Sequence, residues 1–350
     1  MQTIGITKLL EERFPYSMAK RFNIYYRCGG RQRAKQEIVR FLGTNVSSRE
    51  KRRHLRKMRH AYLMYSWRFP EYFLYHYDSL SRTGRKEFVT ETEKNKFCFN
   101  VNPKPLRKLF RDKAQTYNRF AQYYHRSVCE LHVWEQDKSV YFQFVREHRD
   151  YIVKPIDASV GRGVQILHGE QERKIRDLLD EFRTGIVVEE LIEQDPRMAR
   201  PHPQSVNTVR ITTFIVGNKT HVLHPFMRLG CGDSIVDNAG SGGLFCALDL
   251  ETGIVFESVD ENGKRYVVHP DTGIAIVGFQ VPRWKEVVTL AKELAEVIPE
   301  CRFVGWDFAL TEKGWVMVEG NAHGQFLGFQ LPRLQGVRRE LLSLDSDCLR

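Results

Sequence analysis

The chain has 350 residues, of which 42% are hydrophobic and 12% aromatic, so a mostly disordered protein is excluded. No apolar run approaches the roughly 18 residues that a membrane-spanning helix needs. The first residues lack the basic and apolar segments of a signal peptide, and the seven cysteines include no C-x-x-C pair. We therefore expect a cytoplasmic protein with reduced thiols and no transmembrane segment.

Charge is distributed unevenly along the chain. Residues 1–120 hold 28 Lys and Arg against 10 Asp and Glu, and the rest of the chain is net negative. The densest basic run, residues 49–59, has seven basic residues and one acid. Such a run is typical of a surface that binds an anionic carrier, a polymer, nucleic acid or a membrane. It is also typical of a solvated helix face, because Leu55, Met58 and Tyr62 recur at helical spacing.

The predicted elements begin with helices. Residues 1–99 are expected to form a mostly helical, basic and aromatic-rich region, followed by a turn at 102–105 and a helix over 106–124. Short runs with strand character come next and are separated by Gly and Asp or Asn turns. These runs are residues 140–145, 151–154, 185–189, 209–216 and 220–225.

The last third of the chain predicts one more helix and a hairpin. An amphipathic helix over residues 284–298 ends at Pro299. Residues 303–310 and 315–319 then have the pattern of two paired strands. Strands and helices that do not alternate regularly predict an α+β fold and not a doubly wound parallel sheet.

This last hairpin brings polar side chains to one face. With a three-residue turn at 312–314, Asp307 lies opposite Glu319, and the other face is apolar. Asn321 shares the face of Glu319, because strand side chains alternate with period two. Two facing carboxylates repel unless a cation lies between them, and oxygens of Asp, Glu and Asn suit Mg²⁺. The pattern predicts a magnesium site, with a plain surface hairpin as the alternative.

A second motif begins with a strand that ends near Lys154. The loop after it, residues 157–163, offers a hydroxyl and two glycines that let the backbone approach phosphates closely. It matches neither the Walker A pattern nor the dinucleotide fingerprint, so a plain glycine hairpin is the alternative. A third element is the apolar run 186–188, which ends in Glu189 and Glu190.

Together and in this order, the motifs resemble the ATP-grasp superfamily, most closely its sugar-transfer associated branch, over roughly residues 60–330. The resemblance implies an α+β fold in which two lobes clasp ATP after a helical basic N-terminal region. The implied boundaries are 1–99, 100–186 and 187–350. It also implies that Mg²⁺, or Mn²⁺ in its place, is held by Asp307, Glu319 and Asn321.

The resemblance implies two further groups of site residues. Nucleotide contacts are expected from Lys113, Lys154, Ser159, Gly161, Arg162, Gly163, Glu189, Glu190, Ile192 and Asp195. Among these, Glu189 and Glu190 belong to the strand that the resemblance implies holds adenine, and Asp195 is nearest to the position of the ribose acid. Catalytic positions on the acceptor side are Arg210, Arg228 and Asn238. The chain departs from the pattern at Gly305, where many ligases of this fold carry an arginine. The task of that arginine, stabilising an oxyanion, would pass to Arg210 or Arg228.

The implied function is that of an ADP-forming ligase. A small-molecule carboxylate takes the terminal phosphoryl group of ATP, and a small-molecule amine then displaces phosphate from the acyl phosphate. An amino acid coupled to a sugar carboxylate or to a peptide-like precursor is the pair of substrates that the family's name suggests. The alternatives are a kinase that phosphorylates a hydroxyl on the same scaffold, and a polyanion-binding protein built on the basic region.

Overall fold

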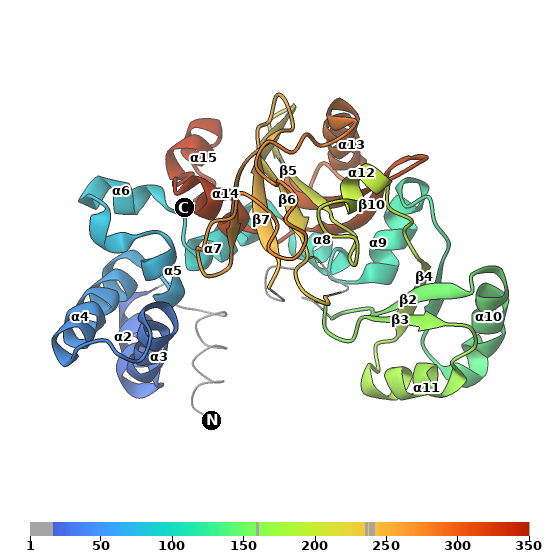
Figure 1. Cartoon of the computed structure of the whole chain (residues 1–350), viewed down its shortest axis with the longest axis horizontal. Coiled ribbons are helices and arrows are strands. Elements are labelled where there is room, and N and C mark those ends of the chain that lie inside the picture. The colour runs from blue at the N-terminus through green and yellow to red at the C-terminus, as the bar shows by residue number, and fades with distance from the viewer. Residues whose placement is uncertain (1–16, 159–160, 235–236, 238–241, 350) are drawn as a thin grey trace. The chain divides into compact units, whose positions relative to one another are not determined.

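The computed structural model of the chain describes residues 17–158, 161–234, 237 and 242–349, which divide into two compact units. Unit 1 comprises Met1–Val101 and Gln325–Arg350, and unit 2 comprises Asn102–Gly324 (Figure 1). Unit 2 is thus inserted into unit 1. The three regions expected from the sequence, 1–99, 100–186 and 187–350, stay a prediction.

Unit 1 is built from helices in the part that the structure describes. Their bounds are α2 (Met18–Arg27), α3 (Gly30–Leu42), α4 (Ser48–Tyr65), α5 (Phe69–Leu74), η1 (Tyr77–Ser79), α6 (Arg82–Glu87), α7 (Glu91–Val101), α14 (Phe326–Arg333) and α15 (Arg338–Leu344). Buried Gln330 of α14 joins the two chain segments, because it accepts from the backbone N–H of Val89 at 2.8 Å and donates to its carbonyl at 2.9 Å. Arg338 of α15 also pairs with Glu93, at 2.5 Å.

The basic run lies on α4, which begins with a capping box between Ser47 and Glu50. Met58 and Tyr62 are buried on one side of this helix, and Arg52 and other basic side chains are exposed. The expected helix with an apolar inner side is therefore confirmed. An anionic partner for the exposed side stays a prediction. None of the helices in the described residues is long and apolar enough to cross a membrane.

Unit 2 contains two antiparallel sheets, which confirms the α+β prediction. The four-stranded sheet has the order β1-β4-β2-β3, and the six-stranded sheet has the order β10-β9-β5-β6-β7-β8. The strands are β1 (Val128–Leu131), β2 (Asp150–Pro155), β3 (Gln165–His168), β4 (Ile186–Glu190), β5 (Val209–Val216), β6 (Lys219–Leu229), β7 (Leu244–Leu248), β8 (Val255–Asp260), β9 (Phe303–Thr311) and β10 (Gly314–Asn321). The helices are α8 (Lys104–Leu109), α9 (Lys113–Phe120), η2 (Ala121–Tyr123), α10 (Trp134–Glu147), α11 (Glu172–Glu181), α12 (Pro196–Ala199) and α13 (Trp284–Val297).

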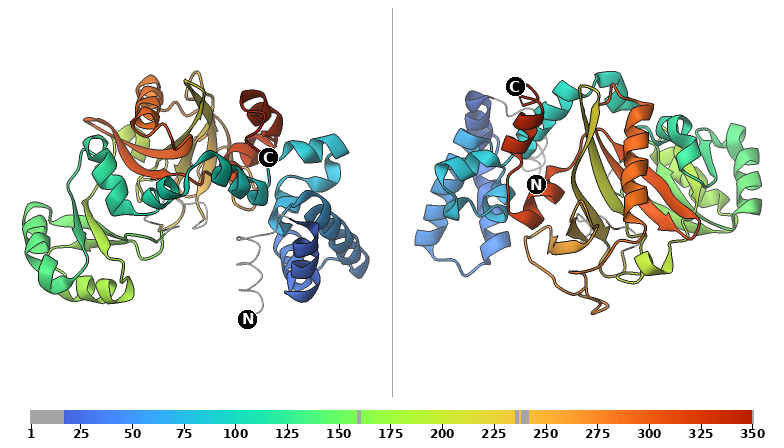
Figure 2. Two further views of the ribbon diagram at one scale, coloured as in Figure 1. Left: turned by 180° about the vertical axis from the view of Figure 1, so that it is seen from behind. Right: turned by 90° about the horizontal axis from the view of Figure 1, so that it is seen from above.

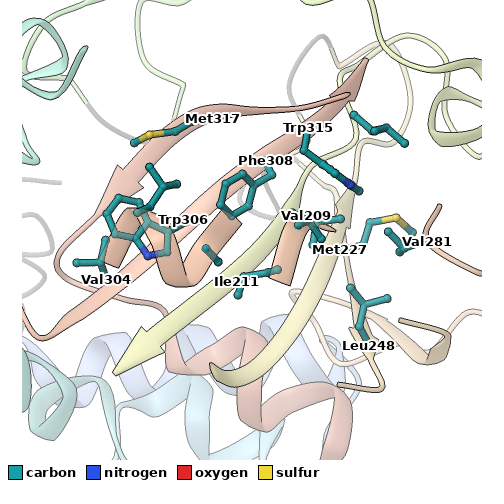
Figure 3. Close-up of a cluster of buried hydrophobic side chains, with 14 of the residues drawn as sticks. Val209, Ile211, Met227, Leu248, Val281, Val304, Trp306, Phe308, Trp315 and Met317 are labelled. Carbon is teal, nitrogen blue, oxygen red and sulfur yellow. The ribbon is translucent and has the colours of Figure 1, made fainter. Parts of the chain in front are cut away.

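Each sheet has its own core. Helices α10 and α11 cover the four-stranded sheet, and α13 lies along the six-stranded sheet, where it packs against β5 (Figures 1 and 2). The core of the larger sheet includes Trp306 and Phe308 of β9 and Val209 and Ile211 of β5 (Figure 3). Two separately packed sheets give the unit a rigid framework that can hold the side chains of a site in place.

Four of the five expected strands are confirmed as β2, β4, β5 and β6, and the fifth was wrong. Residues 140–145 belong to α10, because Tyr141, Phe144 and Val145 recur at helical spacing and are all buried. Helical periodicity overrides the strand propensity of these aromatic and branched residues. The single helix expected over 106–124 is instead divided, because the side chain of Asp112 caps α9 by accepting from the N–H of Gln115 at 2.9 Å.

The final hairpin reaches the expected pairing by another route. Its turn has two residues, so that Thr311 pairs with Gly314, and the expected three-residue turn was wrong. The ladder then skips one residue between Met317 and Glu319, which is a β-bulge at Val318. The bulge compensates for the shorter turn, and Glu319 lies opposite Asp307 as the sequence predicts.

Gly320, next to Glu319, gives a test of this packing. A Cβ at this position would lie 2.6 Å from Cε1 of Phe110 and 3.2 Å from Cζ3 of Trp306, so Gly320→Ala must displace a buried ring. We expect a loss of about 1–3 kcal/mol and a melting temperature lower by several degrees. Thermal denaturation followed by circular dichroism measures this. Gly84→Ala, where a Cβ meets only side-chain atoms at 3.3 Å or more, should melt at or above the wild-type temperature. A Gly320→Ala protein as stable as wild type would contradict the packing.

Candidate functional site

One pocket of unit 2, with a volume of 430 Å³, collects many of the residues expected at the site. Those that line it are Lys113, Lys154, Gly161, Arg162, Glu189, Glu190, Ile192, Arg228 and Glu319. They come from both sheets: Lys154 lies on β2, whereas Arg228 lies on β6 and Glu319 on β10. Residues far apart in the chain therefore meet around one cavity.

Not all of the expected residues are found in the lining of this pocket. Ser159 and Asn238 are outside the described residues. The pocket lining does not include Gly163, Asp195, Arg210, Asp307 or Asn321. The carboxylate of Asp195 accepts from the N–H of Arg197 at 2.9 Å and pairs with its guanidinium at 2.7 Å, so it caps α12 and does not face the cavity. The ribose contact expected from Asp195 therefore gains no support from its position.

Both lysines line the pocket. Lys154 donates to Oε2 of Glu189 at 2.9 Å. Lys113, the first residue of α9, donates to the carbonyls of Pro155 and Ala158 at 3.0 and 2.6 Å. Burial lowers the pKa of Lys113, although the nearby charge of Glu319 partly opposes this. Both ammonium groups are thus held by oxygens of the protein, that of Lys154 on β4 and that of Lys113 just before the glycines of the loop.

Glu189 is the best-held acid of the site. Burial alone would raise its pKa, but the charges of Lys154 and Arg126 outweigh it and lower the pKa to about 2. Arg126 donates to Oε2 of Glu189 from Nε at 3.0 Å and from Nη2 at 2.8 Å. The carboxylate is therefore ionised at neutral pH, and its Oε2 is fully used by these donors.

Sequence reasoning missed Arg126, which lies in the loop before β1 and belongs to no motif. It also gave no role to Thr208. The backbone N–H of Thr208 donates to Asp237 at 2.9 Å, and its hydroxyl accepts from Nη2 of Arg228 at 3.0 Å. Only knowledge of the strand pairing brings these residues together.

A buried charge cluster lies beneath the pocket. Arg210 of β5 donates to both carboxylate oxygens of Asp307, and Arg228 donates to Oδ2 of Asp307 at 2.6 Å. Asp307 is fully buried, so burial would raise its pKa, but the two guanidinium charges lower it. Two arginines of the chain thus balance the charge of Asp307, and the metal ion expected between Asp307 and Glu319 stays a prediction.

Glu319 differs from Asp307 in its exposure. Its side chain is 45% exposed and lines the pocket, and the nearest guanidinium nitrogen, Nη2 of Arg210, is 3.8 Å from its Oε1. Removal of the carboxyl group from water and the negative charge of Asp307 raise the pKa of Glu319. Asn321 lies two residues further along β10, where its Oδ1 accepts from the N–H of His323 at 2.9 Å.

Gly305 makes room for Arg210. The two residues lie on neighbouring strands, and a Cβ at 305 would come within 3.0 Å of both Cδ and Nη1 of Arg210. The side chain of Arg210 therefore fills the space above Gly305. Many ligases of this fold carry an arginine at the position of Gly305, two residues before Asp307. The side chain of such an arginine would begin in the space that Arg210 fills here.

A second group of metal-binding residue types, Cys231, His269 and Asp271, lies outside the pocket lining. Nε2 of His269 donates to the carbonyl of Gly230 at 2.8 Å, and Nδ1 accepts from the N–H of Asp271 at 3.3 Å. Both ring nitrogens are used, so His269 has no lone pair left for a metal ion.

Comparison with known proteins gives a family. A model of the family described as sugar-transfer associated ATP-grasp matches residues 92–346. The sequence matches none of the curated proteins with which it was compared.

Several solved structures are similar to part of the chain. D-alanyl-alanine synthetase A from Vibrio cholerae is 11% identical, with 69% of this chain and 64% of that chain covered and a TM-score of 0.41. The D-Ala:D-Ser ligase VanG from Enterococcus faecalis is 14% identical, with 67% and 62% covered and a TM-score of 0.44. N5-carboxyaminoimidazole ribonucleotide synthetase in complex with ADP is 10% identical, with 62% and 46% covered and a TM-score of 0.40.

The chain thus spans less than two thirds of each of these structures. The family model, in contrast, covers most of the chain, including both sheets and the pocket between them. The chain therefore belongs to the sugar-transfer associated ATP-grasp family and has the ATP-grasp fold.

Proposed function

We propose that the protein is an ATP-dependent ligase that activates a small-molecule carboxylate as an acyl phosphate and couples it to an amine in the cytoplasm. The substrates suggested by the family's name, an amino acid and a sugar carboxylate or peptide-like precursor, are part of this proposal. So are the two lobes, 100–186 and 187–350, that would close on the nucleotide.

One observation carries the proposal: a single pocket is lined by apolar side chains, by positively charged side chains and by an acid of β10. The apolar part comes from Ile152, Val164, Ile166, Leu191 and Ile192, which would suit a planar base. Lys113, Lys154 and Arg162 supply positive charge for phosphates. Arg228, which also lines the pocket, would serve the acceptor side by meeting a substrate carboxylate.

A divalent cation in this pocket would meet Glu319 and would have to replace an arginine partner of buried Asp307. Glu319 lies opposite Asp307, and burial together with the negative charge of Asp307 raises the pKa of Glu319, as expected where two carboxyl groups share a site. With the amide oxygen of Asn321, these two acids would supply the all-oxygen donor set that Mg²⁺ and Mn²⁺ prefer. Bound there, the ion would neutralise charge on the nucleotide phosphates.

The chain's own residues have separate tasks in the proposed reaction. Lys113 and Lys154 hold phosphate oxygens while the substrate carboxylate attacks the terminal phosphorus and ADP leaves. The amine then attacks the acyl carbon, loses a proton and expels phosphate. Arg228, held by Thr208 and Asp307, would orient the carboxylate and stabilise the developing oxyanion, with Arg210 behind it.

The direct test separates the ligase from a kinase. The purified protein is incubated with ATP, Mg²⁺ and single carboxylates, namely amino acids and sugar acids, with and without hydroxylamine. A ligase should release ADP and form a hydroxamate, because hydroxylamine intercepts an acyl phosphate. ADP release that yields only a stable phosphate ester would favour the kinase, and absence of any nucleotide turnover would contradict both.

Nucleotide affinity tests the lysines. We expect Lys154→Ala and Lys113→Ala each to weaken ADP binding by about tenfold or more, since each removes a charge-assisted contact with phosphate. Isothermal titration calorimetry measures the affinity. Lys138→Ala is the control, because Lys138 pairs with Glu135 on the exposed face of α10 and should leave the affinity unchanged. Wild-type affinity in both pocket variants would refute the assignment.

Stability against pH tests Glu319. Because its pKa is raised on folding, protonation of Glu319 stabilises the native state below its ordinary value of 4.5, and that contribution is lost as the pH rises through the raised value. Glu319→Gln should therefore melt higher than wild type at pH 7 and not at pH 4, while turnover is lost. Melting curves at both pH values, with and without Mg-ADP, measure this. Full activity and a wild-type Mg-ADP shift would disprove the metal assignment.

A further inference from the structure

Arg126 is a buried arginine to which the proposed reaction assigns no step. It lies between η2 and β1, only 3% of its side chain is exposed, and its guanidinium stacks on the ring of Tyr124 at 4.4 Å. A guanidinium presents five N–H groups in one plane, and burying it is costly unless they find acceptors. Its acceptors therefore show what the side chain holds together.

One edge of the guanidinium faces Glu189, where Nε and Nη2 both donate to Oε2. Lys154 donates to the same oxygen. No hydrogen bond within the described residues reaches the other oxygen, Oε1, although Glu189 lines the pocket. Arg126 thus fixes the carboxylate by one oxygen and leaves the other for a ligand.

The other edge faces β10. Nη1 donates to the carbonyl of Met317 at 2.6 Å, and Nη2 lies 3.4 Å from the carbonyl of Val318. These two carbonyls belong to the β-bulge that puts Glu319 opposite Asp307. Without the bulge, the alternation of the strand would turn Glu319 to the other face of the sheet.

We propose that Arg126 is a positioning residue that couples recognition of the nucleotide base at Glu189 to the placement of Glu319, which lines the same pocket. The inference rests on the proposed function, since it takes Glu189 as a base contact and Glu319 as a metal ligand. A ligand that fixes Glu189 also fixes the guanidinium, and the guanidinium holds the two carbonyls of the bulge. A ligand on Glu189 thereby further restrains the bulge next to Glu319, which Arg126 already holds without a ligand.

Arg126→Lys separates the two halves of this role. The ammonium group of lysine keeps a positive charge beside Glu189. All its N–H donors lie on one nitrogen, so it cannot also reach the carbonyls of Met317 and Val318. We expect the metal-free Kd for ADP to stay within about threefold of wild type, because the charge on Glu189 remains balanced. The gain in ADP affinity that Mg²⁺ brings should fall by about tenfold, the scale of one lost charge-assisted hydrogen bond.

Calorimetric titration of ADP with and without Mg²⁺ measures both quantities. Arg119→Lys is the matched control, because Arg119 also lies in unit 2 but donates to one carbonyl, that of Val297, at the surface. Arg119→Lys should keep the wild-type gain in ADP affinity that Mg²⁺ brings. A merely structural role of Arg126 would lower the melting temperature and leave the Mg²⁺ gain intact, which would overturn the inference. If wild type itself binds no ADP, or gains nothing from Mg²⁺, the proposed function fails instead.

A measurement on wild type covers the case in which Arg126→Lys does not fold. Adenosine carries the base and the sugar but no phosphate, so it can make the proposed base contact at Glu189 without the phosphate contacts. Its binding without metal should slow amide hydrogen exchange at Val318 and Glu319, the amides of the two peptide groups whose carbonyls Arg126 binds. Bound adenosine with unchanged exchange at both amides would overturn the coupling.

Discussion

The structure depends most on the buried carboxylate of Asp307 and the two guanidinium groups that balance it. A fully buried charge is tolerated only when it is paired and hydrogen-bonded, and the loss of one partner leaves the other costly. Arg210, Arg228 and Asp307 come from three neighbouring strands, β5, β6 and β9. A slip of one residue in any of these ladders would bury unmatched charges, so the cluster constrains the register of the six-stranded sheet.

The same principle of internal balance extends through the pocket. Lys154 is paired with Glu189, and Arg228 with Asp307 and Asp237. In the proposed reaction, a nucleotide would therefore have to exchange partners with the protein. This exchange would cost some affinity, because bonds within the protein would be broken when phosphates bind. In return, the pairing within the protein keeps the cavity in one arrangement while it is unoccupied.

The sequence was most informative where periodicity is clear, as in α13 and in β5, β6, β9 and β10 of the larger sheet. The expected pairing of Asp307 with Glu319 is also found, although a two-residue turn and a bulge produce it in place of the expected three-residue turn. It failed where tertiary packing decides between two local patterns. Residues 140–145 have strand propensity but bury a helical face, and Asp112 ends one helix by capping the next. The contacts of Arg126 and the Asp307 cluster join segments more than 60 residues apart, so no local spacing reveals them.

Because unit 2 is inserted into unit 1, the two units can complete their folding only in a certain order during synthesis. Unit 2 ends at Gly324, so all its strands have been made before α14 and α15 emerge, and it can acquire its fold first. Unit 1 must wait for the last residues, because Gln330 and Arg338 supply partners to Val89 and Glu93. A premature stop after residue 324 would therefore leave the residues of the pocket in place. It would remove Gln330 and Arg338, which bind the amino-terminal segment of unit 1.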